Sequence, residues 1–173
     1  MAMPAPQPID PLDDPISRFD TAVNAFLAMS ADVDPPAKIS GSQNPIEHIQ
    51  RNWEEFKRHI QRSREALIGA QDERLERLEA ILSVGNEIKA LTDDPYIVNP
   101  VDGVAMRATD ERAEFGNIIP AMANATSVPT VFALIGELLG FGTRTIARRQ
   151  EIAKLLNDLT AYYLIKTPPR DSA

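Results

Sequence analysis

The sequence predicts an all-α protein, in which a long rod-like helix with coiled-coil character precedes a C-terminal helical hairpin. Three observations support this fold class. Apolar residues recur at spacings of three and four over most of the 173 residues. Hydrophobic residues make up 43% and charged residues 25%, which is the balance of a folded globular chain. Proline and glycine gather in a few segments between the periodic stretches, where they indicate turns and linkers.

The first 14 residues are predicted to form an extended, Pro-rich arm. Five of the first fifteen residues are proline, which favours extended backbone. The segment has neither the basic nor the apolar region of a secretory signal, so we expect the protein in the cytoplasm or within a particle. The arm is interpreted as disordered, and docking on a neighbouring subunit is the alternative.

Residues 15–43 are predicted to hold a short helix and a linker. Asp14 is a suitable N-cap, and Pro15 suits the first helical position. One face of the helix would carry Ile16, Phe19, Val23, Phe26 and Leu27. The stretch DVDPPAKISGSQNP that follows is rich in proline and small polar residues, which indicates a linker or an irregular crossover.

Residues 44–93 give the strongest helical signal. Asn44, Pro45 and Glu47 supply an N-cap, a first-turn proline and a glutamate that can reach back to the cap. The apolar seam that follows has coiled-coil spacing and consists of Ile46, Ile49, Trp53, Phe56, Ile60 and Leu67. The seam then slips by one residue, which a simple two-stranded coiled coil would not do. The sequence leaves open whether the segment is one helix or is broken at Gly69 or Gly85.

The length of this segment indicates self-association. An unbroken helix over residues 45–91 would extend about 70 Å at 1.5 Å per residue. The short helices expected elsewhere in the chain would not cover such a rod. We therefore expect the six seam residues to bury their side chains against another chain, in a homo-oligomer or in contact with other protein subunits.

Residues 94–173 are predicted to form a C-terminal helical region. The stretch LTDDPYIVNPVDG indicates a long turn, and Gly116 would close a short helix after it. An apolar helix would then begin near residue 128 and end at the turn Gly140-Phe141-Gly142. A second helix of the hairpin would continue to Lys166, where two prolines stop it.

The residue types give no support for catalysis, a metal or another cofactor. The chain has no cysteine and only two histidines, His48 and His59. Eleven residues along a helix separate these histidines by about 16 Å, so they would not share a metal. No glycine is followed by the Lys-Ser/Thr pair of a phosphate-binding loop. A non-enzymatic protein is expected.

The charge distribution argues against a protein that binds nucleic acid over its whole surface. The net charge is −7 and the isoelectric point is near 4.9. Residues 105–173 carry a net charge of +1, so an anionic partner would meet the C-terminal third. The apolar stretch before Gly142 has about fifteen strongly apolar residues, and a bilayer needs about 20. A membrane-spanning segment is not expected.

Residues 132–151 resemble the helix-turn-helix family of DNA-binding proteins. The residues that match its pattern of small and apolar positions are Ile135, Gly136, Leu139, Gly140, Phe141 and Ile146. The resemblance implies that five residues face a DNA groove, namely Thr143, Arg144, Thr145, Arg148 and Arg149. Arg149 departs from the pattern, which expects an apolar anchor there. A hairpin that only packs explains the same residues, because glycine commonly terminates helices.

Two functions are consistent with these features. The leading interpretation is a non-enzymatic structural or assembly subunit that self-associates through the long amphipathic helix, for example in a phage particle (virion) or another bacterial multi-subunit assembly. The alternative is a helix-turn-helix DNA-binding regulator that the long helix dimerises. The sequence specifies neither the assembly nor the number of subunits.

Overall fold

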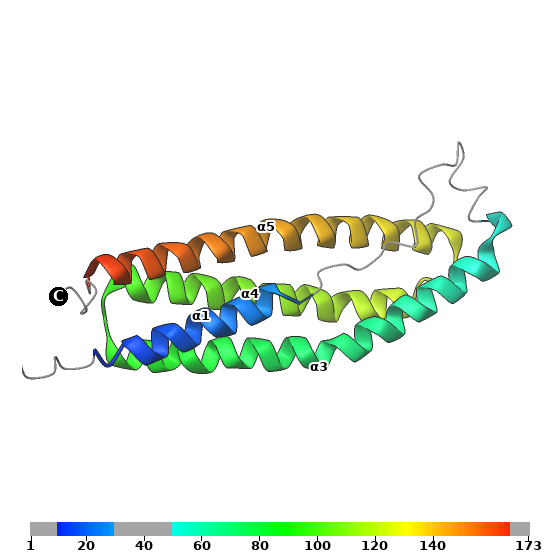
Figure 1. Cartoon of the computed structure of the whole chain (residues 1–173). Coiled ribbons are helices and arrows are strands. Elements are labelled where there is room, and N and C mark those ends of the chain that lie inside the picture. Colours follow the sequence, from blue (N-terminus) through cyan, green and yellow to red (C-terminus); the bar gives the residue numbers. More distant parts are fainter. Residues whose placement is uncertain (1–9, 30–49, 167–173) are drawn as a thin grey trace, which may run out of the picture.

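Four helices make up the described part of the chain, in the order α1 (Asp13–Leu27), α3 (Trp53–Leu91), α4 (Pro95–Ala123) and α5 (Val128–Lys166) (Figure 1). The computed structural model describes residues 10–29 and 50–166. Helix α4 packs against both α3 and α5, and α1 packs against α3 and, over a smaller area, against α5. No strand occurs in these two ranges, which confirms the all-α prediction.

Helix α1 begins slightly earlier than the sequence indicates. Its first residue is Asp13, and the Asp10 carboxylate accepts a hydrogen bond from the Leu12 backbone N–H at 2.9 Å just before it. The predicted N-cap, Asp14, is wrong, because its carboxylate lies in the first turn and pairs with Arg18 at 2.8 Å. The buried face is as predicted and includes Ile16, Phe19, Val23 and Phe26. Most of the predicted arm (1–9) and of the predicted linker (30–43) lies outside the described residues.

Helix α3 is continuous through both of its glycines, which answers the question that the sequence left open. A methyl group at Gly85 would lie 3.1 Å from Val101 Cγ1, so the missing side chain lets α3 and α4 approach closely. Gly69 has no such neighbour within 4 Å. The predicted helix start at residues 44–47 lies outside the described residues, and the described helix begins at Trp53 after a turn at Asn52.

Helix α4 runs without interruption through Pro100, Gly116 and Pro120. The predicted long turn and the predicted helix end at Gly116 are therefore wrong. The real turn is short, because Asp94 caps α4 by accepting a hydrogen bond from the Tyr96 N–H at 3.0 Å, and Pro95 takes the first helical position. Burial of an apolar face along the whole helix outweighs the local cost of these helix-breaking residues.

Helix α5 is a single helix of 39 residues, so the predicted turn at residues 140–142 is wrong. None of the described glycines has a positive φ, and Phe141 in the middle of the predicted turn is buried. The helical hairpin of this protein is formed instead by α4 and α5. Its turn lies between Asn124 and Ser127, where the Ser127 and Thr130 hydroxyls bond each other at 2.9 Å.

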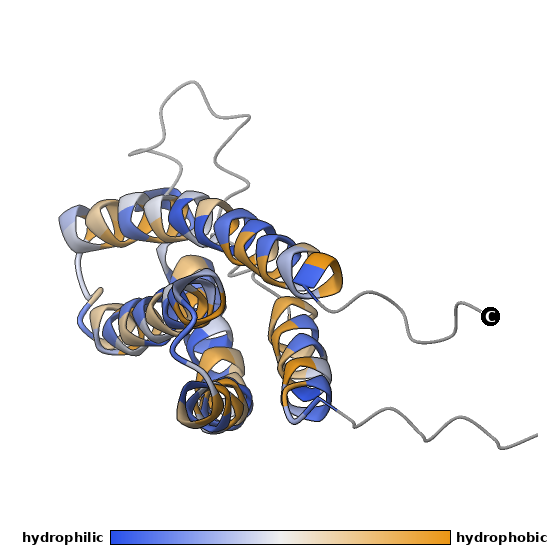
Figure 2. Ribbon diagram, turned by 90° about the vertical axis from the view of Figure 1, so that its left-hand side faces the viewer, coloured by the Kyte–Doolittle hydropathy of each residue, from blue (hydrophilic) through white to orange (hydrophobic). Residues whose placement is uncertain are grey.

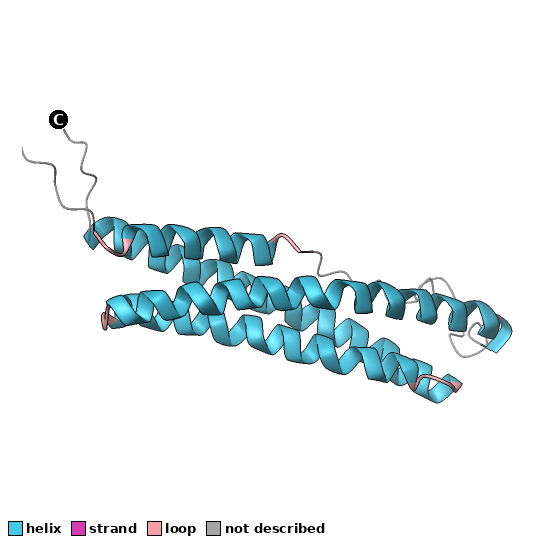
Figure 3. Cartoon of the chain, turned by 90° about the horizontal axis from the view of Figure 1, so that it is seen from below, coloured by secondary structure: helices cyan, strands magenta, loops and turns pink. Residues whose placement is uncertain are grey.

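The apolar interior is divided into two clusters along the length of the bundle. The first cluster lies where α1 covers the other three helices, and we call this part the four-helix half (Figures 1 and 3). The second lies beyond the end of α1, around the α4–α5 turn, and we call this part the three-helix half, since only α3, α4 and α5 form it among the described residues. Seen along the bundle, the apolar sides of the helices face one another (Figure 2). The second cluster is Phe56, Ile60, Leu67, Phe115, Ile118, Met122, Ala125, Val131, Leu134, Ile135, Leu138 and Phe141.

The predicted oligomerisation seam contributes to this second cluster. Phe56, Ile60 and Leu67 are buried within the chain, and Trp53 is half-buried against them. The premise that the chain has no helix long enough to cover α3 is therefore wrong, because α4 and α5 are much longer than their internal glycines and prolines indicated. The other two seam residues, Ile46 and Ile49, lie outside the described residues.

Polar contacts close the opposite end of the bundle, where α3 turns into α4. The Asp94 carboxylate accepts hydrogen bonds from the Tyr162 hydroxyl at 2.6 Å and from Lys166 Nζ at 3.0 Å. The bond from Tyr162, followed by that from Lys166, lowers the pKa of Asp94. Nearby, the Tyr163 hydroxyl donates to the Asp13 carboxylate. These contacts hold the start of α1, the α3–α4 turn and the end of α5 together.

Candidate functional site

A layer of charged and polar side chains separates the two apolar clusters. We call it the polar layer, and its members are Arg74 of α3, Glu111 and Glu114 of α4, and Thr145, Arg148 and Arg149 of α5. Three of them are almost completely buried: Glu111 has an exposed fraction of 1%, Thr145 of 1% and Arg74 of 5%. Such groups rarely lie inside a protein unless they are paired.

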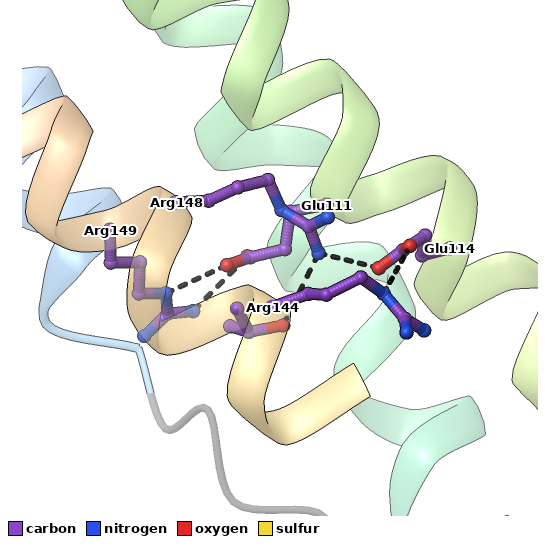
Figure 4. Close-up of polar contacts among 6 residues, drawn as sticks. Glu111, Glu114, Arg144, Arg148 and Arg149 are labelled. Atoms are coloured by element: carbon purple, nitrogen blue, oxygen red, sulfur yellow. Dashed lines mark hydrogen bonds and ion pairs between the residues drawn. The ribbon is translucent and has the colours of Figure 1, made fainter. Parts of the chain in front are cut away.

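The pair between Glu111 and Arg149 lies deepest in the polar layer. Arg149 Nε and one of its terminal nitrogens, Nη2, donate to the two Glu111 oxygens at 2.8 and 3.1 Å (Figure 4). The other terminal nitrogen, Nη1, donates to the Met29 backbone carbonyl at the end of α1. This two-pronged geometry lets a guanidinium compensate for the desolvation of a carboxylate. One arginine thus joins α4, α5 and the end of α1.

Arg74 brings a second cation to the same place from α3. Its guanidinium carbon lies 3.9 Å from the centre of the Phe115 ring. Desolvation on burial lowers the pKa of Arg74, the negative charge of Glu111 opposes this shift, and the positive charge of Arg149 adds to it. The carboxylate of Glu111 therefore balances positive charge from two helices.

Glu114 forms the outer part of the polar layer, one turn further along α4. It accepts hydrogen bonds from Arg148 at 2.7 Å and from Arg144 at 2.8 Å (Figure 4). Desolvation raises the pKa of Glu114, but the hydrogen bond and charge of Arg148, followed by those of Arg144, outweigh it, so the net shift is downward. Glu114 is therefore held ionised between two arginines.

The five residues that the sequence analysis assigned to a DNA groove do not lie on one surface. Thr145 is buried, and the side chains of Arg148 and Arg149 are only 14% and 12% exposed. Thr143 and Arg144 lie at the surface, and Arg144 is paired with Glu114. The turn on which the helix-turn-helix resemblance depends is absent. DNA binding remains an untested prediction, with fewer accessible residues to support it.

Arg74 and the two glutamates are the members of the polar layer that the sequence analysis missed. Glu111 and Glu114 lie three residues apart in a segment that reads as an ordinary charged helix surface. One signal did point to them, because Arg149 occupies a position where the surrounding pattern requires an apolar side chain. A charge at a core position calls for a buried partner, but the pattern gives no information on which acidic residue it is.

Two further properties bear on the function. Helix α5 is long and apolar enough to cross a bilayer by its length and composition alone. This is weak evidence for a membrane span, because core helices of soluble proteins can be as long and as apolar. Within residues 10–29 and 50–166, no three His, Cys, Asp or Glu side chains come together as they would around a metal ion.

No protein-family model, no curated protein and no solved structure matches this chain. The function must therefore be inferred from the chain's own residues and their arrangement.

Proposed function

We propose that this protein is a non-enzymatic structural or assembly subunit that self-associates, as a component of a phage particle or another multi-subunit assembly. The observation that carries the proposal is the unequal length of the helices. Helix α1 covers one half of the bundle and ends at the polar layer, where Arg149 binds the carbonyl of Met29. Among the described residues, the other half is a three-helix bundle with no helix in the corresponding place. We infer that another subunit packs against this half.

The position of the self-associating surface differs from the one that the sequence indicated. Phe56, Ile60 and Leu67 of the predicted seam are buried inside the chain, so these three residues are not available to a second subunit without unfolding the core. We therefore place the contact between subunits on the surface of the three-helix half.

The polar layer supports a structural role for the arginines. Each carboxylate in it binds guanidinium groups of α5, so these cations stabilise the packing of α4 on α5. A buried ionic layer also fixes which residues of neighbouring helices meet, because a shift of one helical turn would leave a charge without its partner. Binding a phosphate instead would require breaking these pairs.

The proposal is tested by the mass of the full chain in solution. Light scattering over a range of micromolar concentrations should give a mass that is a multiple of 19.1 kDa. The same measurement with added duplex DNA should show no larger complex at physiological salt. A monomer throughout the concentration range would contradict self-association.

A separate variant distinguishes the DNA-binding alternative. Arg144 is the one arginine of α5 in the polar-layer region whose side chain is more than half exposed, so Arg144→Ala changes a surface cation with little effect on the core. Arg112→Ala, on the exposed face of α4, is the matched control. A salt-dependent shift of duplex DNA that is lost in Arg144→Ala and retained in Arg112→Ala would favour the regulator over the assembly subunit.

A further inference from the structure

One face of α5 carries exposed apolar and uncharged residues from the three-helix half to the polar layer. Its members follow one another at spacings of three and four, as residues on a single helix face do. We call this face the α5 stripe, and it consists of Phe132, Gly136, Leu139, Thr143, Ile146 and Gln150. Five of these six residues are exposed and Phe132 is half-buried. The stripe is about 27 Å long at 1.5 Å per residue.

The apolar residues at the centre of the stripe are large and strongly exposed. Leu139 has an exposed fraction of 55% and Ile146 of 58%, and they lie one heptad apart. Single exposed apolar residues are common on protein surfaces, but two at this spacing on an uncharged helix face form a continuous apolar surface. Ile146 lies one turn before Arg149, which contacts the end of α1. The α5 stripe therefore lies close to the side of α5 that α1 covers in the four-helix half.

Glycine gives a second, independent observation at the same place. Gly136 belongs to the stripe, and Gly142 lies beside Thr143. A methyl group built on either glycine would have no neighbour within 4 Å, and neither glycine has a positive φ. Each glycine costs about 1 kcal/mol relative to alanine inside a helix, and nothing in the chain's own packing requires it. A glycine would be needed at these positions if the backbone of another helix approached closely.

The charge and the residue order of the α5 stripe are compatible with a second copy of this chain as the partner. The net charge is −7, so two copies repel each other wherever acidic surfaces meet. The α5 stripe has no charged residue, so a second copy can present the same face without like-charge repulsion. The placement of the large side chains is also symmetric, since Leu139 lies four residues before Thr143 and Ile146 three residues after it. Two antiparallel stripes that cross near Thr143 would therefore bring Leu139 of one copy beside Ile146 of the other.

We propose that the α5 stripe is the two-fold contact between two copies of this chain, with the axis close to Thr143. In this arrangement Leu139 of one copy packs near Ile146 of the other. The inference rests on the proposed self-association and names the surface and the partner. It places the contact on α5, in a segment that the sequence analysis assigned to a DNA-binding turn.

The experiment compares charged substitutions inside and outside the stripe. In the full chain, the double variant Leu139→Glu, Ile146→Glu should weaken self-association by at least about tenfold, because it buries four carboxylates in a symmetric contact. Leu164→Glu is the matched control, since Leu164 is 64% exposed on the same helix outside the stripe. Sedimentation at several concentrations gives the mass, and circular dichroism checks that each variant remains helical.

Three results are informative. Loss of the dimer in the double variant alone supports the stripe. A wild-type oligomer that persists in the double variant overturns this inference and leaves the proposed self-association intact, whereas a wild-type monomer overturns both. A wild-type monomer that floats with vesicles of phosphatidylcholine and phosphatidylglycerol, and loses this property in the double variant, would assign the stripe to a membrane surface instead.

Cross-linking tests the same contact without a charged substitution, so it remains applicable if the double variant unfolds. The chain has no cysteine, so a single introduced thiol reacts without background. A residue near a two-fold axis lies close to its own copy, and a disulfide needs Cα atoms about 4 to 7 Å apart. Thr143→Cys should therefore form a disulfide-linked dimer under mild oxidation, and Leu164→Cys should not. Equal cross-linking of the two variants would overturn the proposed axis.

Discussion

The two halves of the bundle share three helices and differ in the surroundings of their glycines. In the four-helix half, methyl groups at Gly85 and Gly103 would lie 3.1 Å from Val101 and 2.9 Å from Leu155, so these glycines allow close packing between helices. In the three-helix half, four glycines have no neighbour within 4 Å of such a methyl group, namely Gly69, Gly116, Gly136 and Gly142. Gly85 and Gly103 thus allow tight packing between helices, whereas these four glycines face open space.

We expect the two halves to differ in stability, although α3, α4 and α5 run through both. The first cluster takes side chains from four helices, whereas the described part of the second takes them from three. Fewer buried contacts allow local opening at a lower free energy. We therefore expect the three-helix half to open first in an isolated chain, and its amide hydrogens to exchange faster than those of the four-helix half.

The largest effect is expected from removing a core aromatic ring. Phe19 of α1 is completely buried in the four-helix half, and Phe19→Ala should lower the free energy of unfolding by about 3 to 5 kcal/mol. Phe56 is 8% exposed in the three-helix half, and Phe56→Ala should cost less because the site can relax more readily. Urea unfolding followed by circular dichroism measures both. Equal losses would show that the halves are equally well packed.

The next effect concerns the polar layer between the halves. Glu111→Gln keeps the shape of the side chain but removes the carboxylate that pairs with Arg149 and offsets the charge of Arg74, and it should cost about 1.5 to 3 kcal/mol. Glu151→Gln is the control, since Glu151 is 58% exposed in its pair with Arg107 and should change stability by less than about 1 kcal/mol. Chemical denaturation compares the two variants. A Glu111→Gln protein as stable as wild type would mean that the buried pair contributes nothing.

Alanine at the glycines should change stability with opposite sign in the two halves. Gly69→Ala adds a methyl group in open space on a helix and should stabilise the protein by up to about 1 kcal/mol. Gly85→Ala presses against Val101, whose branched side chain has little freedom to move, and should destabilise it by about 1 kcal/mol. Melting temperatures of the two single variants test this contrast, and a shift of the same sign in both would refute it.

The smallest effect is the dependence of stability on pH. The folded-state pKa of Glu114 lies below its ordinary value of 4.5, so its ion pairs stabilise the fold above that value, and this contribution is lost as the pH falls through the lower folded-state pKa. Glu114→Gln removes the contribution. Wild type should therefore be more stable than the variant at neutral pH, and the two melting temperatures should converge in acid. A difference that stays constant with pH would contradict this assignment.

The periodicity of the sequence predicted the buried face of α1 and the helix in the long segment that contains α3, whereas its glycines and prolines led to wrong turns in α4 and α5. Ile16, Phe19 and Val23 are buried as their spacing indicated. Pro100 and Gly140, in contrast, lie inside helices where the sequence predicted turns. A glycine or proline costs about 1 to 3 kcal/mol locally, and burying an apolar face along a long helix outweighs that cost. Local composition contains no information about this tertiary gain.

The sequence predicted only one side of the candidate site, the arginines of α5. The sequence singled out Arg144, Arg148 and Arg149, and these residues do form a cluster on α5. Their partners, Glu111 and Glu114, lie between 30 and 38 residues away in the chain, on a helix that the sequence predicted to be much shorter. Which charges meet depends on how α4 and α5 are aligned, and that alignment follows from packing along their whole length. The arginines therefore looked accessible when considered without their partners.

The contact between Tyr163 and Asp13 has a mechanical consequence. It brings the first turn of α1 beside the last turns of α5, so the two described ends of the bundle lie together (Figure 1). A stretching force applied through these ends would load the contacts one after another, as in opening a zipper, and not all at once along the helices. The bundle should therefore unfold at low force despite its long helices. Helix α1 should detach from the other helices first.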